Sequence, residues 1–136
     1  MIIAIPQLNY KAGDIQGNSE KIISAIQKAQ NQKAELILFP ELAVSGALPQ
    51  DLLEREEFVN ACRMAVEKIA ATCTQIAAIV GAPNLDSENG IMYNSAYFIQ
   101  HGEVVDGVHK NILSDYDIFS ESRYFIAGED NTPIRY

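Results

Sequence analysis

Short apolar runs alternate along this chain with longer segments in which apolar residues recur every three to four positions. The short runs are typical of strands buried on both faces, and the longer segments are typical of the amphipathic helices that connect such strands. This alternation predicts an α/β fold. We expect strands at residues 2–8, 36–39, 76–80, 93–99 and 104–108.

Two segments carry the helical pattern. The first helix is expected to begin near Ser19, with Asn18 or Ser19 as its N-cap after a turn-rich stretch. The second is expected from about residue 53 to residue 74. The predicted buried stripes consist of Ile22, Ile23, Ile26 and Ala29 in the first helix, and of Phe58, Cys62, Ala65, Val66, Ile69 and Cys73 in the second.

The last two predicted strands are separated only by a turn at His101-Gly102. A connection this short joins antiparallel strands, because parallel strands need a crossover of a dozen or more residues. Strands joined through the helices are expected to run parallel. We therefore expect a mixed sheet rather than a purely parallel one.

Composition narrows the function classes. The chain has 136 residues, enough for one domain, and its 18 acidic against 10 basic residues give a net charge of −8 that disfavours nucleic acid and anionic membranes. No apolar stretch approaches the roughly 20 residues needed to cross a bilayer, and the apolar N-terminal run ends at Pro6 without a basic leader. We expect a cytoplasmic protein with both cysteines reduced.

Two charged residues occupy positions where an α/β sheet places its ligands. Glu41 follows the predicted strand at 36–39, and Lys110 follows the one at 104–108. At such strand ends a glutamate can serve as a general base and a lysine can stabilise an oxyanion, as amide cleavage requires. The alternative interpretations are a turn or helix N-terminus for Glu41 and an exposed surface position for Lys110.

Neither cysteine is placed to complete such a site as the nucleophile. Cys62 and Cys73 lie eleven residues apart, close to three helical turns, and both fall on the apolar stripe of the second predicted helix. Free cysteines in that setting act as small hydrophobic residues. No paired-cysteine spacing or histidine cluster indicates a zinc site.

Several short motifs of the chain resemble those of one known family and occur in the same order along the sequence. They are Gln7-Leu8-Asn9, Gly13-Asp14, Gly17-Asn18, Phe39-Pro40-Glu41-Leu42, Ser45-Gly46, Pro49-Gln50-Asp51-Leu52-Leu53 and Phe119-Ser120-Glu121-Ser122-Arg123-Tyr124-Phe125. The chain resembles the nitrilase, or carbon–nitrogen hydrolase, superfamily, and within it the glutaminase domain of glutamine-dependent NAD synthetases. The resemblance implies an αββα sandwich of which residues 1–136 form only the N-terminal part.

The same resemblance implies roles for individual residues. Glu41 is expected to be the general base and Lys110 the cation that stabilises the tetrahedral intermediate. Tyr116 matches a glutamine-binding tyrosine, and Glu121 matches a second carboxylate that orients the lysine. The family's nucleophilic cysteine is expected beyond Tyr136, so that residues 1–136 alone are expected to be inactive.

The reaction implied by the resemblance has two halves. L-Glutamine is hydrolysed through a thioester, and the ammonia passes to a second domain that uses ATP and magnesium to amidate deamido-NAD to NAD. No cofactor is expected in residues 1–136 themselves, since no Gly-rich phosphate loop is present in them. A homo-oligomer is expected from the same resemblance.

Three positions depart from the family pattern, and two other functions stay open. Ala47 stands where relatives often carry an aromatic residue, Ser114 where they carry proline, and Ser120 where they carry aspartate. Ser114 is expected to leave the following loop less constrained. The alternatives are a stand-alone nitrilase-type amidase or carbamoylase, and a non-catalytic fragment that assembles with a partner chain.

Overall fold

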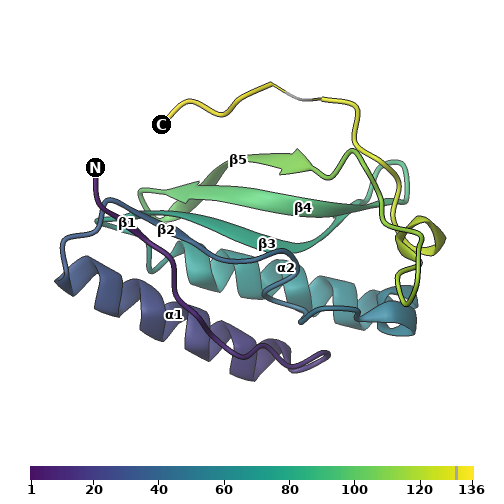
Figure 1. Cartoon of the computed structure of the whole chain (residues 1–136), viewed down its shortest axis with the longest axis horizontal. Coiled ribbons are helices and arrows are strands. Elements are labelled where there is room, and N and C mark those ends of the chain that lie inside the picture. The colour runs from purple at the N-terminus through teal and green to yellow at the C-terminus, as the bar shows by residue number, and fades with distance from the viewer. Residues whose placement is uncertain (131) are drawn as a thin grey trace.

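The computed structural model describes residues 1–130 and 132–136, and it contains one sheet and two α-helices (Figure 1). The strands are β1 (Ile3–Ala4), β2 (Leu36–Leu38), β3 (Ala77–Asp86), β4 (Ile91–Gln100) and β5 (Glu103–His109). The α-helices are α1 (Ile15–Asn31) and α2 (Glu56–Ala70), and the short 3-10 helices are η1 (Gln50–Glu54) and η2 (Glu121–Arg123).

The sheet is mixed, as the sequence predicts. Its strand order is β1-β2-β3-β4-β5; β2 runs parallel to β1 and to β3, and β4 runs antiparallel to β3 and to β5. The β4–β5 turn lies at His101-Gly102, and both residues adopt positive φ angles of 56° and 87°. The sheet therefore changes from parallel to antiparallel at β3.

The core lies between the two helices and one face of the sheet. Cross-strand neighbours Ile37, Ala78 and Ile99 are fully or almost fully buried on that face, together with the apolar stripes of α1 and α2. On the opposite face, the ring of Tyr136 packs edge-to-face on Phe98, with a centroid distance of 6.1 Å. Figure 1 shows the C-terminal residues passing the sheet on the side away from the helices. Among the described residues, no helix combines the length and apolar character that a bilayer-spanning helix needs.

The N-terminal boundaries differ from the sequence prediction. The first strand covers Ile3–Ala4 rather than residues 2–8, because Pro6 has no N–H to donate to a sheet neighbour. The first helix begins at Ile15 rather than near Ser19, and its N-cap is Asp14, whose side chain accepts a hydrogen bond of 3.0 Å from the Gly17 N–H.

Asn18 does not cap α1 but links it to other parts of the chain. Asn18 lies in the first turn of α1 and its side chain is buried. This side chain accepts a hydrogen bond from the Lys11 N–H at 2.9 Å and donates to the carbonyls of Lys11 and Val44 at 2.9 and 3.1 Å. These bonds tie α1 to the segment that precedes it and to the chain that follows β2. Such a link depends on the tertiary fold, and the local sequence could not show it.

We expect the substitution Asn18→Ala to lower the free energy of unfolding by about 2–3 kcal/mol, because it leaves the buried carbonyl of Val44 and the part-buried backbone groups of Lys11 without their partner. Urea unfolding of the chain would measure this loss. Asn60→Ala, an exposed change on α2, is the matched control. Equal stability of the two variants would contradict the role assigned to Asn18.

The second half of the fold shows two further differences. The predicted helix at 53–74 is two elements, η1 and α2, separated by Arg55 in an extended conformation (φ −96°, ψ 112°). Cys73 is buried but lies beyond the end of α2. The third strand was predicted to end at Val80, but it continues through Gly81 and Pro83 to Asp86.

Pro83 is tolerated because of where β2 ends. The pairing of β2 with β3 stops at Ile79, so that β3 is paired only with β4 from that point onward. A proline in a strand is acceptable where its missing N–H faces an unpaired side. This arrangement makes β3 and β4 a long hairpin that carries one wall of the site described next.

Candidate active site

Glu41 lies at the carboxyl end of β2, where the chain leaves the sheet. The Phe39 N–H donates to the Ile79 carbonyl at 2.9 Å, and the Val44 N–H donates to the Gly81 carbonyl at 3.2 Å, so residues 40–43 pass directly over Gly81. A Cβ atom at Gly81 would lie 2.5 Å from the Pro40 carbonyl oxygen and 2.8 Å from the Cα of Glu41. Only glycine at this position lets the chain place Glu41 so close to β3.

Lys110 immediately follows β5 and is fixed by its backbone. Its N–H donates to the Asn94 carbonyl at 2.8 Å, and its own carbonyl accepts from the Gly128 N–H at 2.9 Å. The residue is thus held between β4 and the segment that returns after η2. Its side chain is 28% exposed, so the ammonium group is only partly solvated.

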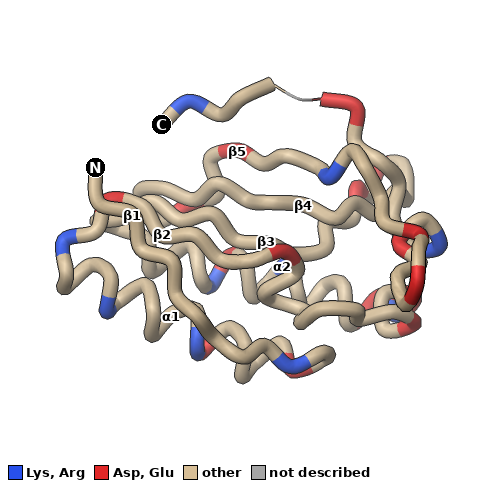
Figure 2. The backbone as a smooth tube through the Cα atoms, in the orientation of Figure 1, with Lys and Arg blue, Asp and Glu red and all other residues tan. Residues whose placement is uncertain are grey.

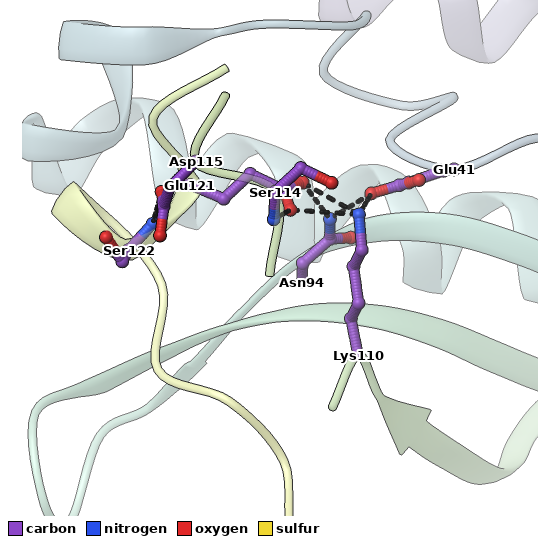
Figure 3. A network of polar contacts seen from close by, with 7 residues as sticks. All are labelled: Glu41, Asn94, Lys110, Ser114, Asp115, Glu121 and Ser122. Carbon is purple, nitrogen blue, oxygen red and sulfur yellow. Dashed lines mark hydrogen bonds and ion pairs between the residues drawn. The ribbon is translucent and has the colours of Figure 1, made fainter. Parts of the chain in front are cut away.

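The structure brings Glu41 and Lys110 into contact and adds Glu121 (Figure 3). The Nζ of Lys110 lies 2.8 Å from Oε1 of Glu41, and it lies 3.0 and 2.9 Å from Oε1 and Oε2 of Glu121. Glu121 is in η2 and its side chain is only 10% exposed, whereas that of Glu41 is 51% exposed. One ammonium group therefore bridges a half-exposed and a buried carboxylate.

Asn94 of β4 belongs to the same network, although its role was not predicted from the sequence. Its Nδ2 donates to Oε1 of Glu41 at 2.5 Å and to Oε1 of Glu121 at 3.3 Å, and the residue is 3% exposed. The available signal was an asparagine at the second position of the strand predicted at 93–99. A buried amide in such a place needs hydrogen-bond partners, which here are the two carboxylates.

The loop between Lys110 and Glu121 is closed by reciprocal hydrogen bonds. The Ser114 N–H donates to Oε2 of Glu121 at 2.6 Å, and the Glu121 N–H donates to the Ser114 carbonyl at 3.1 Å. Next to this pair, the Ser122 N–H donates to Oδ1 of Asp115 at 2.9 Å. Proline at position 114 could not donate the first bond, so Ser114 makes a contact with Glu121 that proline could not make.

These contacts set the charge states of the buried pair. Burial alone would raise the pKa of Glu121, but the Lys110 ammonium and the Ser114 N–H together hold that pKa below its usual value. Burial would likewise lower the pKa of Lys110, but its bonds to Glu41 and Glu121 raise it above the usual value. Both groups are therefore charged at neutral pH.

A cleft of about 290 Å³ opens beside the network, and its lining residues are Phe39, Glu41, Gly81, Asn94, Ser95, Ala96, Val108, His109 and Lys110. A larger groove of about 820 Å³ lies between residues 4–8 and α1, but neither Glu41 nor Lys110 lines it. We place the candidate chemistry in the smaller cleft because the charged network lines it. Figure 2 shows further acidic residues around η1 and η2.

His109 forms a separate local contact in this cleft wall. Its Nδ1 lies 2.7 Å from the Ser95 hydroxyl oxygen, and its ring stacks on Tyr93 at a centroid distance of 4.1 Å. Burial lowers the pKa of His109, although Asp86 acts in the opposite direction. His109, which directly precedes Lys110, is thus neutral at pH 7 and is held in place by Ser95 and Tyr93.

Tyr116 lies outside this network. Its side chain is 67% exposed, and its ring contacts Phe119 at a centroid distance of 5.5 Å. Within residues 1–130 and 132–136, no hydrogen bond joins its hydroxyl group to Glu41 or Lys110. A contact of Tyr116 with glutamine stays a prediction.

The cysteines are placed as the sequence analysis expects, inside the core. Both are fully buried, and burial raises the pKa of Cys62 to about 12 and that of Cys73 to about 11. Neither residue lines the cleft beside Glu41 and Lys110. Both thiols are therefore protonated at neutral pH and remote from the candidate base.

The carbon–nitrogen hydrolase profile matches residues 2–135, almost the whole chain. The chain belongs to the carbon–nitrogen hydrolase family. This membership confirms the predicted nitrilase-like α/β fold, of which the described residues supply one mixed sheet and the helices on one of its faces.

Individual relatives of this carbon–nitrogen hydrolase domain are longer proteins. The chain is 40% identical over 124 residues to the glutamine-dependent NAD(+) synthetase of Xylella fastidiosa, covering 90% of this chain and 22% of the relative. The glutamine-dependent NAD+ synthetase of Acinetobacter baumannii has a TM-score of 0.86 at 33% identity, covering 98% of this chain and 25% of that one. An amidase from Nesterenkonia sp. has a TM-score of 0.80 at 28% identity, covering 98% and 50%. The chain thus spans about a fifth of the length of the curated relative.

Proposed function

We propose that residues 1–136 are the N-terminal part of a carbon–nitrogen hydrolase domain that releases ammonia from L-glutamine. The observation that carries this proposal is the contact of Glu41 and Lys110 at the cleft of a chain in this family. We assign Glu41 as the general base, Lys110 as the oxyanion-stabilising cation, and Tyr116 as a glutamine contact. Because neither Cys62 nor Cys73 lines the cleft, the attacking thiol is assigned to residues outside 1–136.

The proposed chemistry follows from these groups. Glu41 takes the proton of the thiol as sulfur bonds to the amide carbon of glutamine, and the negative charge moves to the carbonyl oxygen beside Lys110. When the tetrahedral intermediate collapses, the C–N bond breaks and Glu41 returns the proton to the departing nitrogen, giving ammonia and a thioester. Water then attacks the thioester and gives a proton to Glu41; the C–S bond breaks, Glu41 returns that proton to the sulfur, and glutamate leaves.

For the intact protein we propose a glutamine-dependent NAD synthetase. This proposal is supported by curated relatives at 34–40% identity from Xylella, Aquifex and Thermotoga that carry that name. Deamido-NAD, ATP and magnesium would then bind a second domain outside residues 1–136, and ammonia would reach that domain from glutamine. We further propose a cytoplasmic homo-oligomer.

A second candidate is a stand-alone amidase acting on a small amide. It is favoured by the Nesterenkonia amidase, whose fold this chain matches over 98% of its length. The two candidates share the roles of Glu41 and Lys110. They differ in the substrate and in the presence of a synthetase domain. Experiment can therefore distinguish one candidate from the other.

The deciding experiment starts from the reading frame beyond the codon for Tyr136. We expect it to encode a cysteine-bearing strand and then a nucleotide-binding domain, and we expect the purified product to release glutamate from glutamine and to form NAD from deamido-NAD and ATP. Glu41→Gln should lower its kcat by about 10²- to 10⁴-fold. Glu57→Gln, an exposed change on α2, is the matched control and should leave kcat unchanged.

The other outcomes would reject the synthetase. Hydrolysis of small amides without hydrolysis of glutamine would support the amidase. A protein that cleaves neither class of amide would leave the non-catalytic assembly function. Residues 1–136 alone are expected to release no glutamate, and glutamate release from them that disappears in Glu41→Gln would contradict the assignment of the nucleophile.

A further inference from the structure

The cleft network contains more negative than positive charge. Two carboxylates, Glu41 and Glu121, share the single ammonium group of Lys110. Like charges held this close oppose each other, and one cation neutralises only half of their charge. The remaining stabilisation comes from hydrogen bonds, and Asn94 is the side chain that donates to both carboxylates.

The amide of Asn94 can face the carboxylates in one orientation only. Ionised carboxylates accept hydrogen bonds and cannot donate them, so the NH₂ group rather than the carbonyl oxygen must point at Glu41 and Glu121. That group has two N–H bonds, which suffices for one bond to each carboxylate. Asn94 is also rigid, because it is buried in β4 and its backbone carbonyl accepts the Lys110 N–H at 2.8 Å.

The two donors meet on the same atom of Glu41. Asn94 Nδ2 and Lys110 Nζ both bind Oε1, at 2.5 and 2.8 Å. A carboxylate can exchange its two oxygens by rotating about its last carbon–carbon bond, and a single flexible lysine shared with Glu121 would resist that rotation weakly. A second donor from a rigid strand fixes the orientation of the carboxylate plane.

We propose that Asn94 is a positioning residue that holds Oε1 of Glu41 against Lys110 and so presents Oε2 as the oxygen that takes the proton from the nucleophile. This inference rests on the proposed function of Glu41 as the general base. A neutral amide suits the task, because a second cation would fix the carboxylate equally well but would make it a weaker base. Asn94 itself forms no bond with the substrate in this proposal.

The first test uses the 136-residue chain and no activity. In Asn94→Asp the side chain keeps its size but loses both N–H donors and adds a negative charge. We expect the titration midpoint of the Glu121 carboxyl carbon, followed by NMR, to move upward by about one pH unit. In Asn94→Ser a single O–H can serve one carboxylate, and a smaller upward shift is expected.

Asn89→Ala provides the matched control for this titration. Asn89 also donates its side-chain amide to a carboxylate, Asp86, at 2.7 Å, but it does so in the exposed β3–β4 turn. We expect this variant to leave the Glu121 titration unchanged. A Glu121 midpoint that stays in place in both Asn94 variants, or that moves equally in Asn89→Ala, would overturn the proposed bridge.

The second test uses the longer protein expressed from the continuing reading frame. We expect Asn94→Asp to lower kcat for glutamine hydrolysis by about 10- to 100-fold and Asn94→Ser by less, with KM changed by no more than about twofold, because Asn94 orients the base and does not touch substrate. Thermal melting identifies a variant that does not fold, and the other then supplies the comparison. A kcat within twofold of the wild type in a folded variant overturns the positioning role.

The two tests keep this proposal separate from the proposed function. If the longer wild-type protein hydrolyses no amide, the proposed function fails, while the Glu121 titration still decides whether Asn94 bridges the carboxylates. If the wild type is active and the Asn94 variants raise KM without lowering kcat, the proposed function stands and Asn94 acts on substrate binding instead. Both results would reject Asn94 as the residue that positions the base.

Discussion

Replacement of Lys110 by methionine is expected to abolish glutamine hydrolysis by the longer protein, lowering kcat by about 10³-fold or more. Methionine keeps much of the volume of lysine and removes only the ammonium group. The loss combines two effects: no cation remains beside the developing oxyanion, and Glu41 and Glu121 face each other without a positive charge between them. Steady-state glutamate release measures the effect.

The same substitution should destabilise the 136-residue chain, and this part of the prediction does not depend on catalysis. We expect a loss of about 2 kcal/mol in the free energy of unfolding, because Glu121 is left buried without its cation. Lys68→Met, an exposed change on α2, is the control and should cost only a few tenths of a kcal/mol. A Lys110→Met chain that is as stable as the control would show that the network contributes little to folding.

The pH dependence of this loss has a definite sign. In the wild-type chain the pKa of Glu121 is lowered on folding, so its contribution to stability is present above about pH 4 and is lost as the pH falls through the folded-state pKa. In Lys110→Met, burial without the cation should raise that pKa instead. The variant should therefore gain stability relative to the wild type as the pH is lowered from 7 toward 4.

The positions of Glu41 and Lys110 at the ends of strands could be predicted from the sequence. An apolar run followed by Glu41 and another followed by Lys110 place both side chains at the sheet margin, and the structure joins them at 2.8 Å. The antiparallel direction of β4 and β5 was also predictable, because the His101-Gly102 turn is too short for a parallel connection.

Asn94 and the second half of β3 could not be predicted by the same reasoning. Asn94 was hidden because its role depends on two residues, Glu41 and Glu121, that are 53 and 27 positions away in the chain. The strand beyond Val80 was hidden because Gly81 and Pro83 are usually strand breakers. Only the tertiary arrangement, in which β2 ends early and its continuation crosses β3, makes both residues acceptable in the strand.

Gly81 therefore gives the second large prediction, because it couples the sheet to the site. We expect Gly81→Ala to lower the free energy of unfolding of the 136-residue chain by about 3 kcal/mol, since the new Cβ would lie 2.5 and 2.6 Å from backbone atoms of Pro40 and Leu42. Neither backbone atom can rotate away as a side chain could. The chain that carries Glu41 must shift instead.

The shift has a functional consequence in the longer protein. A displacement of about 1 Å at Glu41 would move the base away from Lys110 and Asn94, and we expect kcat for glutamine hydrolysis to fall by about 10²-fold. Gly107→Ala is the matched control in the same sheet, because its Cβ would meet the Ala96 carbonyl at an ordinary 3.4 Å. Urea unfolding and kcat are measured for both variants. If Gly81→Ala matches Gly107→Ala in both quantities, the close crossing at Gly81 does not position Glu41.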